Sequence, residues 1–182
     1  MSSATETTNS SNANQILSGY CYCGEVKYEV DTKQDPIFPP CYCHCEDCRR
    51  AHAAPLYQVA CIDMNTEWKI VQGSDRIQKY SRPNAKNGIT RCFCNQCGTK
   101  LFNEFDIKED WAPKDKKIMV FFPDTSTKED RAKLPYSYQP KSHNRSQDCV
   151  LDMKLLSNLN IKDTAGYADH SKVDGDNSSA DR

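Results

Sequence analysis

The sequence lacks both a long hydrophobic run and an excess of charge of either sign. No apolar stretch approaches the ~20 residues that a membrane-spanning helix requires, so we expect no membrane association. The chain has 24 Lys and Arg residues against 25 Asp and Glu residues, a formal net charge of −1 at pH 7. A balanced charge provides no broad positive field to attract nucleic acid. The composition therefore argues against a nucleic-acid-binding protein.

The N-terminal sequence also lacks the features of a secretory signal. The letters MSSATETTNSSNANQ contain no basic region, no apolar stretch and no cleavage site. We therefore expect an intracellular protein, cytoplasmic or, as the alternative, nuclear. In a reducing compartment the 11 cysteines are expected to be free thiols or metal ligands rather than disulfides.

No internal repeat and no second block of composition divides the 182 residues, which favours one domain. Residues 1–16 are rich in Ser, Thr and Asn, and residues 162–182 combine Gly, Ser and Asp with a surplus of acidic side chains. Neither segment has enough apolar side chains to offset the entropy cost of ordering, so we expect two disordered tails. The predicted folded domain spans residues 17–161.

Apolar residues alternate with polar ones in many short segments, which predicts a mainly β fold. Val26, Tyr28 and Val30 alternate with charged residues, as in a strand with one buried face. Further strands are predicted at Leu56–Ile62, Trp68–Val71, Ile77–Tyr80, Ile89–Phe93, Lys100–Phe105 and Ile118–Phe122. The helix-compatible stretches are short, at Glu46–Ala53 and Lys128–Lys133, so an alternating α/β fold is not expected. We expect a single all-β, sandwich-like domain.

Three cysteines lie close together in the pattern Cys43-x-Cys45-x-x-Cys48. Three thiolates can hold a zinc ion and leave its fourth position open. An open position is typical of catalytic zinc, whereas structural zinc has four protein ligands. The pattern therefore predicts a reactive zinc site.

Two further cysteine pairs are each followed by a glycine, in the patterns Cys21-x-Cys23-Gly24 and Cys94-x-x-Cys97-Gly98. Their four sulfurs could form a closed structural zinc site, and glycine allows the chain to turn sharply beside the ligands. A metal held between the two pairs would tie distant parts of the chain together, with a free energy that can reach ~10 kcal/mol. The alternative is that Cys21 and Cys23 are small buried apolar residues.

Three segments carry these motifs: SGYCYCG at residues 18–24, CHCEDCRRAHAAP at residues 43–55 and FCNQCGTKLF at residues 93–102. In order and internal spacing they resemble the glutathione-dependent formaldehyde-activating enzyme family, which includes the centromere protein V-like proteins. The downstream segment Tyr138-Gln-Pro-Lys-Ser-His143 is similar to a later Pro-x-x-His element of that family.

The resemblance implies a folded-sheet β architecture similar to Mss4, with two zinc ions per chain. The implied structural ligands are Cys21, Cys23, Cys94 and Cys97, and the implied catalytic ligands are Cys43, Cys45 and Cys48. The resemblance also implies a carbon–sulfur lyase that joins formaldehyde to glutathione, an S-(hydroxymethyl)glutathione synthase-like activity.

The four remaining cysteines are Cys41, Cys61, Cys92 and Cys149. Cys41 and Cys92 each lie two residues before a proposed ligand, so a shifted ligand register is the alternative at both motifs. We prefer the registers given above because only they reproduce the complete motifs. Cys61 and Cys149 are interpreted as core or loop residues.

The open zinc site predicts thiol chemistry. Coordination strongly lowers the pKa of a thiol, so a small thiol such as glutathione would be a nucleophile at neutral pH and could attack formaldehyde. Three cysteinates leave the centre with a formal charge of −1, which makes it a poor Lewis acid and favours sulfur chemistry over hydrolysis.

Basic residues near the third ligand are candidates for substrate binding and proton transfer. Arg49 and Arg50 could bind a substrate carboxylate, with a solvated surface pair as the alternative. His52 could carry a proton to the nascent alkoxide, since an unperturbed imidazole pKa of ~6.5 suits that task, and a packing role is the alternative. His44 lies between two ligands and is expected to point away from the ion.

Two other functions are weighed against the enzyme. One is a non-enzymatic binding module of the centromere protein V type, in which both zinc ions only stabilise the fold. A chromatin or microtubule binder is expected to carry a basic extension, and both predicted tails are neutral or acidic, which favours the enzyme. The other is an iron–sulfur protein, which the spacing disfavours because Cys-x-Cys beside Cys-x-x-Cys does not follow ferredoxin patterns.

Overall fold

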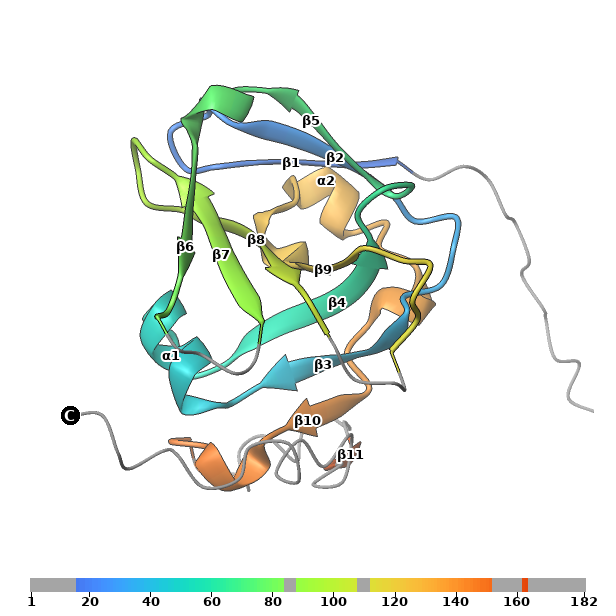
Figure 1. Ribbon diagram of the computed structural model, residues 1–182. Coiled ribbons are helices and arrows are strands. Elements are labelled where there is room, and N and C mark those ends of the chain that lie inside the picture. Colours follow the sequence, from blue (N-terminus) through green and yellow to red (C-terminus); the bar gives the residue numbers. More distant parts are fainter. Residues whose placement is uncertain (1–15, 84–87, 108–111, 152–161, 164–182) are drawn as a thin grey trace, which may run out of the picture.

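The computed structural model describes residues 16–83, 88–107, 112–151 and 162–163. They form a mainly β fold with two sheets and short helices (Figure 1), which confirms the predicted fold class. The expected disordered tails lie outside the described residues, apart from Ile16 and Lys162–Asp163, so the proposed domain limits stay a prediction. Within the described part of the chain, no helix is long and apolar enough to cross a membrane.

The smaller sheet contains three antiparallel strands in the order β1-β2-β5. Their bounds are Ile16–Tyr20 for β1, Lys27–Asp31 for β2 and Trp68–Gln72 for β5. As the alternation predicts, Tyr28 and Val30 of β2 are fully buried while Lys27 is exposed. The ring of Tyr28 stacks on Trp68 of the neighbouring strand with centroids 4.3 Å apart. Trp68 also contacts Phe102 of the larger sheet, with ring centroids 5.1 Å apart, so the pair packs the smaller sheet against the larger one.

The larger sheet has the strand order β11-β10-β3-β4-β9-β8-β7-β6. Its strands are β3 Phe38–Cys43, β4 Tyr57–Asp63, β6 Ile77–Ser81, β7 Ile89–Cys94, β8 Lys100–Phe105, β9 Ile118–Phe121, β10 Ser142–Asn144 and β11 Lys162–Asp163. The central pairs from β3 to β6 are antiparallel, whereas β10 pairs with β3 and β11 in parallel. The six further predicted strands correspond to β4, β5, β6, β7, β8 and β9.

Both predicted helical stretches form short helices, α1 at Glu46–His52 and α2 at Lys128–Arg131. Helix α1 follows β3 and precedes β4, and it lies beside the ends of β3 and β6 in Figure 1. Its Asp47 pairs with Arg82, just beyond β6, with Nη1 and Oδ1 3.1 Å apart. Single 3-10 turns lie at Ser74–Arg76, Pro123–Thr125, Tyr136–Tyr138 and Ser146–Asp148.

The two faces of the larger sheet contribute to different apolar clusters. Ala60 and Ile62 of β4 belong to the main core, which also contains Leu17, Val26, Tyr28, Val30, Leu101, Phe102, Met119, Phe121 and Tyr138. Val59 and Cys61 of the same strand belong to a second cluster, because alternate residues of a strand face opposite sides. We call this second group the thiol cluster. It comprises Cys41, Cys43, Cys45, Cys48, Tyr57, Val59, Cys61, Phe105, Val120 and Phe122.

Candidate metal centres

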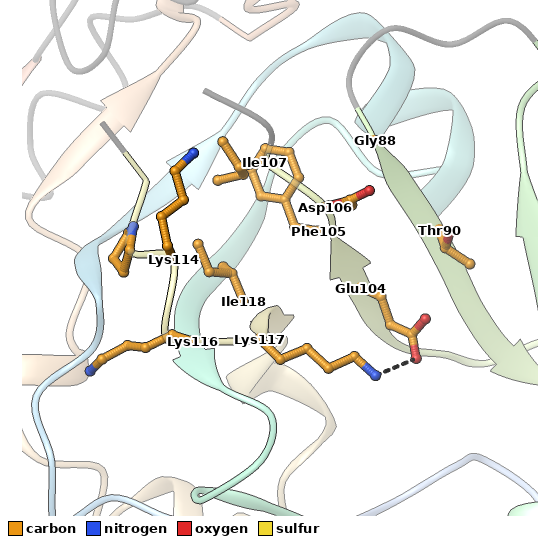
Figure 2. Close-up of a pocket in the computed structure, with 11 residues that line it drawn as sticks. Gly88, Thr90, Glu104, Phe105, Asp106, Ile107, Lys114, Lys116, Lys117 and Ile118 are labelled. Carbon is orange, nitrogen blue, oxygen red and sulfur yellow. Dashed lines mark ion pairs between the residues drawn. The ribbon is translucent and has the colours of Figure 1, made fainter. Parts of the chain in front are cut away.

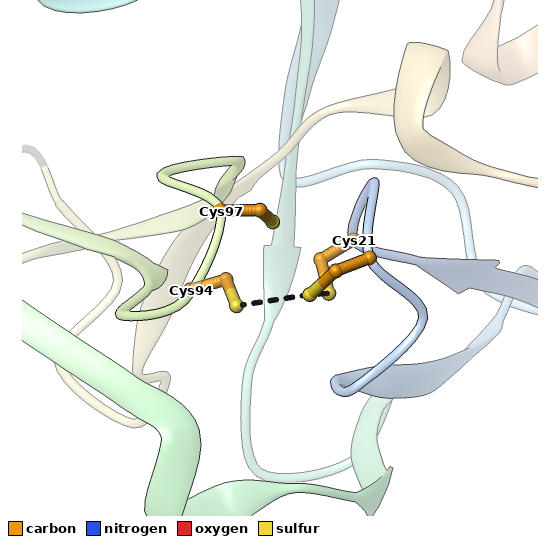
Figure 3. A group of neighbouring side chains, drawn as sticks. Cys21, Cys94 and Cys97 are labelled. Carbon is orange, nitrogen blue, oxygen red and sulfur yellow. Dashed lines mark hydrogen bonds between the residues drawn. The ribbon is translucent and has the colours of Figure 1, made fainter.

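Four cysteines from two turns converge on one point. The sulfurs of Cys21, Cys23, Cys94 and Cys97 all lie within 4.8 Å of one another. Two of the separations are 3.4 Å, from Cys21 to Cys23, and 3.7 Å, from Cys23 to Cys94. Four sulfurs at about 2.3 Å from a tetrahedral zinc ion would be about 3.8 Å apart. Figure 3 shows Cys94 and Cys97 on one turn, facing Cys21 on the other.

The two turns are shaped by their glycines, as predicted. Gly24 and Gly98 have φ values of +78° and +75°, a left-handed conformation that glycine adopts at little steric cost. The turns are also joined directly, since Tyr22 N donates to Thr99 Oγ1 at 3.0 Å. Burial raises the pKa of Cys97, but hydrogen bonds with Thr99 and Cys23 outweigh it and lower the pKa to about 6. The second turn therefore favours a thiolate, which is the ligand form of cysteine.

The other three predicted ligands meet where β3 leads into α1. Cys43 is the last residue of β3, Cys45 caps the helix N-terminus and Cys48 lies in the first turn of the helix. Their sulfurs all lie within 4.8 Å of one another. Cys45 Sγ accepts a hydrogen bond from Cys48 N at 3.4 Å, so the helix start itself orients two of the sulfurs. A group of three sulfurs fits a metal ion with one open position.

The three thiols stabilise one negative charge between them. Hydrogen bonds from Cys43 and from Cys45 hold the pKa of Cys48 well below its usual range. The pKa of Cys43 is raised well above its usual range, first by its hydrogen bond with Cys45 and then by that with Cys48. A concentrated negative charge on buried sulfur is the condition that a divalent cation relieves.

The region around Cys48 also contains two groups that the motifs did not reveal. Tyr57, the first residue of β4, pairs with Cys43 in the sheet, and its hydroxyl forms a hydrogen bond with the sulfur of Cys48. Arg91 of β7 is close enough for its charge to lower the pKa of Cys48 as well. Both groups favour the thiolate form of that sulfur.

His52 lies at the end of α1, packed between aromatic rings. It stacks on Tyr57 with centroids 4.1 Å apart and meets the edge of Phe122 at 4.8 Å. Burial lowers the imidazole pKa to about 4, so the ring is neutral at pH 7. Its Nε2 is buried and has no hydrogen-bond partner among the described residues. The ring is therefore held in place with one buried nitrogen unpaired within the described residues.

The two arginines that follow Cys48 already have partners. Arg49 Nε donates to the carbonyl oxygen of His44 at 3.0 Å. Arg50 Nη2 lies 2.7 Å from Glu46 Oε1, one turn earlier on the helix, and its side chain is 73% exposed. The first arginine braces the ligand loop, and the second takes part in a surface ion pair.

His44 points away from the three sulfurs into a buried histidine pair. Its Nε2 lies 2.8 Å from Nδ1 of His143, and both residues are almost fully buried. His143 belongs to β10, which pairs in parallel with β3 through His143 and Tyr42. This pair anchors the loop between two ligands to a strand that is distant in sequence.

The other four cysteines belong to neither sulfur group. Cys41 and Cys61 are half-buried in the thiol cluster, and Cys92 is buried in the main core. Burial raises the pKa of Cys41 to about 12, which keeps it a neutral thiol. Cys149 follows the last 3-10 turn, and its thiol donates to Leu151 O at 3.5 Å.

A pocket of about 580 Å³ lies beside β8 and β9, and Figure 2 shows the residues that line it. It is lined by Gly88, Thr90, Glu104, Phe105, Asp106, Ile107, Pro113, Lys114, Lys116, Lys117 and Ile118. Lys117 Nζ lies 3.9 Å from Glu104 Oε1. Among the described residues, the lining of this pocket contains no cysteine or histidine. The candidate metal ligands therefore lie in the two sulfur groups and not in the pocket.

Sequence reasoning missed Tyr57, Arg91 and the histidine pair because strand pairing brings them to the site. Arg91 left one signal, since a charged residue between Ile89 and Phe93 interrupts an otherwise apolar alternation. The register that places Tyr57 opposite Cys43 left none.

Comparisons with known proteins bear on the same residues. The family model described as glutathione-dependent formaldehyde-activating enzyme matches residues 16–135. This range includes all seven cysteines of the two sulfur groups. A crystal structure of a Rhodobacter sphaeroides protein is 19% identical, with a TM-score of 0.44, over 60% of this chain and 86% of that chain. The search of curated proteins found no match.

Proposed function

The chain belongs to the glutathione-dependent formaldehyde-activating enzyme family, and from that premise we propose that it is a zinc-dependent carbon–sulfur lyase acting on glutathione and formaldehyde. The observation that carries the proposal is the three-sulfur group of Cys43, Cys45 and Cys48, beside a separate group of four. Two zinc ions per chain are proposed, one structural and one catalytic.

The residues present fit zinc at both positions. All donors are sulfur atoms, and their separations of 4.8 Å or less are compatible with a tetrahedral ion. Cys21, Cys23, Cys94 and Cys97 would hold the structural ion, and Cys43, Cys45 and Cys48 the catalytic one. When bound at the second position, zinc would lower the pKa of a substrate thiol and hold its sulfur as a nucleophile.

The chain itself would set the electrostatics of that step. Tyr57 donates a hydrogen bond to Cys48, and the positive charge of Arg91 lies nearby. Both interactions disperse the negative charge of the sulfur group, so an additional thiolate can approach at a lower energetic cost. The aromatic rings of Tyr57 and Phe122 shield His52 from water.

The proposed reaction is an addition. The sulfur of the thiol forms a bond to the formaldehyde carbon, the carbon–oxygen double bond becomes single, and the thiol proton finishes on the oxygen. His52 is the proposed carrier of that proton, since its Nε2 has no partner among the described residues. With a pKa lowered to about 4, the ring accepts and releases a proton only transiently at pH 7. The reverse steps would release the aldehyde.

Arg49 and Arg50 stay proposed carboxylate ligands for glutathione, and each would have to exchange a present partner. Arg49 would leave the carbonyl oxygen of His44, and Arg50 would leave Glu46. The second exchange is the easier one, because an exposed ion pair contributes only about 0–1 kcal/mol. The proposed location of the reaction is the cytoplasm, where cysteine ligands stay reduced.

Calorimetry can test this proposal. The zinc-loaded protein is titrated with glutathione, with and without formaldehyde, and the experiment is repeated with Cys48→Ser and with Cys149→Ser. Binding heat is expected in the wild type and in the Cys149 control, and its loss is expected in Cys48→Ser. With ¹³C-labelled formaldehyde, NMR should detect faster formation of the hydroxymethyl thioether. Equal heats in all three proteins, with no rate acceleration, would favour a purely structural role for both sites.

A further inference from the structure

Arg91 has a guanidinium group without a partner in the described part of the chain. It forms no ion pair and no side-chain hydrogen bond there, and its Nη1 is buried. Desolvated polar groups of proteins are almost always hydrogen-bonded, and an arginine presents several N–H donors in a fixed plane. A buried guanidinium nitrogen without a partner therefore indicates that an acceptor binds there.

The fold aims this group at the face of the larger sheet that holds the thiol cluster. Ile89 and Arg91 lie on one side of β7, since alternate strand residues share a face. Ile89 pairs with Phe105, which is part of the thiol cluster. Cys92 of the same strand faces the other way, into the main core. Arg91 and the sulfur of Cys48 therefore lie on the same side of the sheet.

A second cation lies on this face. Lys100 of β8 pairs with Phe93, and its Nζ lies 4.4 Å from the centroid of that ring. Burial lowers the pKa of Lys100, and the charge of Arg91 lowers it further. The two positive charges also act together on His52. No carboxylate forms an ion pair with either cation in residues 16–83, 88–107 and 112–151.

The sulfur group can balance these charges through space, but it leaves the N–H donors of Arg91 unpaired. Arg91 acts on the sulfur of Cys48 through its charge and not through a hydrogen bond. Outside the sulfur group, the hydrogen bond to that sulfur comes from Tyr57. A carboxylate matches a guanidinium with two parallel hydrogen bonds and adds the opposite charge. A carboxylate is the anionic group of the thiol proposed as substrate, and it satisfies both requirements.

We propose that Arg91, with Lys100 beside it, is the specificity-determining residue that binds a carboxylate of the thiol substrate. This inference rests on the proposed function, because it needs a thiol at the three-sulfur site. It differs from the expectation for Arg49 and Arg50, which have partners of their own. The site would then bind thiols that carry a carboxylate more tightly than neutral thiols of the same size.

The test compares two thiols that differ in one group, 3-mercaptopropionate and 3-mercaptopropanol. Their dissociation constants are measured by calorimetry with the zinc-loaded wild type, Arg91→Met and Arg91→Gln. Arg131→Met is the matched control, since Arg131 pairs with Asp124 on the surface. Zinc content and the circular dichroism spectrum confirm that each variant is folded.

We expect the wild type and the Arg131 control to prefer the carboxylate thiol by about tenfold or more. Arg91→Met should remove that preference while the neutral thiol binds as before, and Arg91→Gln should retain only part of it. Equal binding of both thiols to the wild type would overturn the inference without any variant, and so would a preference that survives in Arg91→Met. If neither thiol binds the wild type, the proposed function itself fails.

Discussion

The substitution Tyr57→Phe isolates one hydrogen bond at the three-sulfur site. The ring of Tyr57 stacks on His52 and meets the edge of Phe122 at 5.5 Å, and phenylalanine preserves both contacts. The hydroxyl donates to the sulfur of Cys48, and only this bond is lost. Loss of a group that supports a metal ligand typically lowers metal affinity by about 10- to 100-fold. We expect a decrease near the lower end, because two neighbouring thiols also stabilise Cys48.

The measurement is a competition between the protein and a chelator of known zinc affinity. Zinc should leave the three-sulfur site of Tyr57→Phe about tenfold more readily than that of the wild type. The four-sulfur site should be unchanged, since Tyr57 contacts none of its ligands. Tyr136→Phe is the matched control, because Tyr136 is 80% exposed. Unchanged affinity at the three-sulfur site, or equal weakening of both sites, would refute the role assigned to the hydroxyl.

Three further predictions concern other polar groups. Asp130→Asn should lower the free energy of unfolding by about 1 kcal/mol at pH 7, measured in urea, because Asp130 accepts a hydrogen bond from Ser18 N at 2.8 Å. That bond lowers the carboxyl pKa of folded Asp130. The stabilisation is therefore present above the unfolded pKa of ~3.9 and is lost as pH falls through the lower folded pKa. A difference in unfolding free energy between wild type and variant that does not change with pH would contradict this. His143→Ala should weaken zinc binding at the three-sulfur site in chelator competition, because His44 loses its 2.8 Å hydrogen bond. Equal loss of zinc affinity at the three-sulfur and four-sulfur sites would argue against this role. The ring resonances of His52 should titrate by NMR with a midpoint near 4, and a midpoint at the ordinary value of ~6.5 would show that the ring is solvated.

Most strands could be predicted from alternation alone, and the exceptions have local causes. Strand β3 contains Pro39 and Pro40, which cannot donate ladder hydrogen bonds, so its sequence resembles a loop. Its register with β4 shifts between Phe38 and Cys41, which accommodates the prolines. Strand β1 contains Ser18 and Gly19 in place of apolar residues, and β10 is only three residues long. Prolines in β3, small residues in β1 and the shortness of β10 therefore leave these segments without a clear period of two.

The three-sulfur group and each cysteine pair of the four-sulfur group could be predicted because metal-ligand spacing within a motif is encoded locally, whereas the meeting of the two pairs depends on the fold. Cys43, Cys45 and Cys48 are brought together by a strand end and one helical turn. The groups that surround them depend on pairing between distant strands, as with Tyr57 opposite Cys43. A one-residue change of strand register would move such a side chain to the other face of the sheet. Residue spacing alone therefore could not identify Tyr57 or Arg91.

The positions of the two sulfur groups explain how the fold can separate stability from reactivity. Cys21 and Cys94 pack within the main core, and their turns join the smaller sheet to the β7–β8 hairpin of the larger one. Cys43 and Cys48 pack in the thiol cluster, on the other face of the larger sheet. A metal in the first group would stabilise contacts between the sheets, whereas exchange of a ligand at the second would leave those contacts intact. The proposed thiol chemistry at the three-sulfur site would therefore proceed without loosening the core.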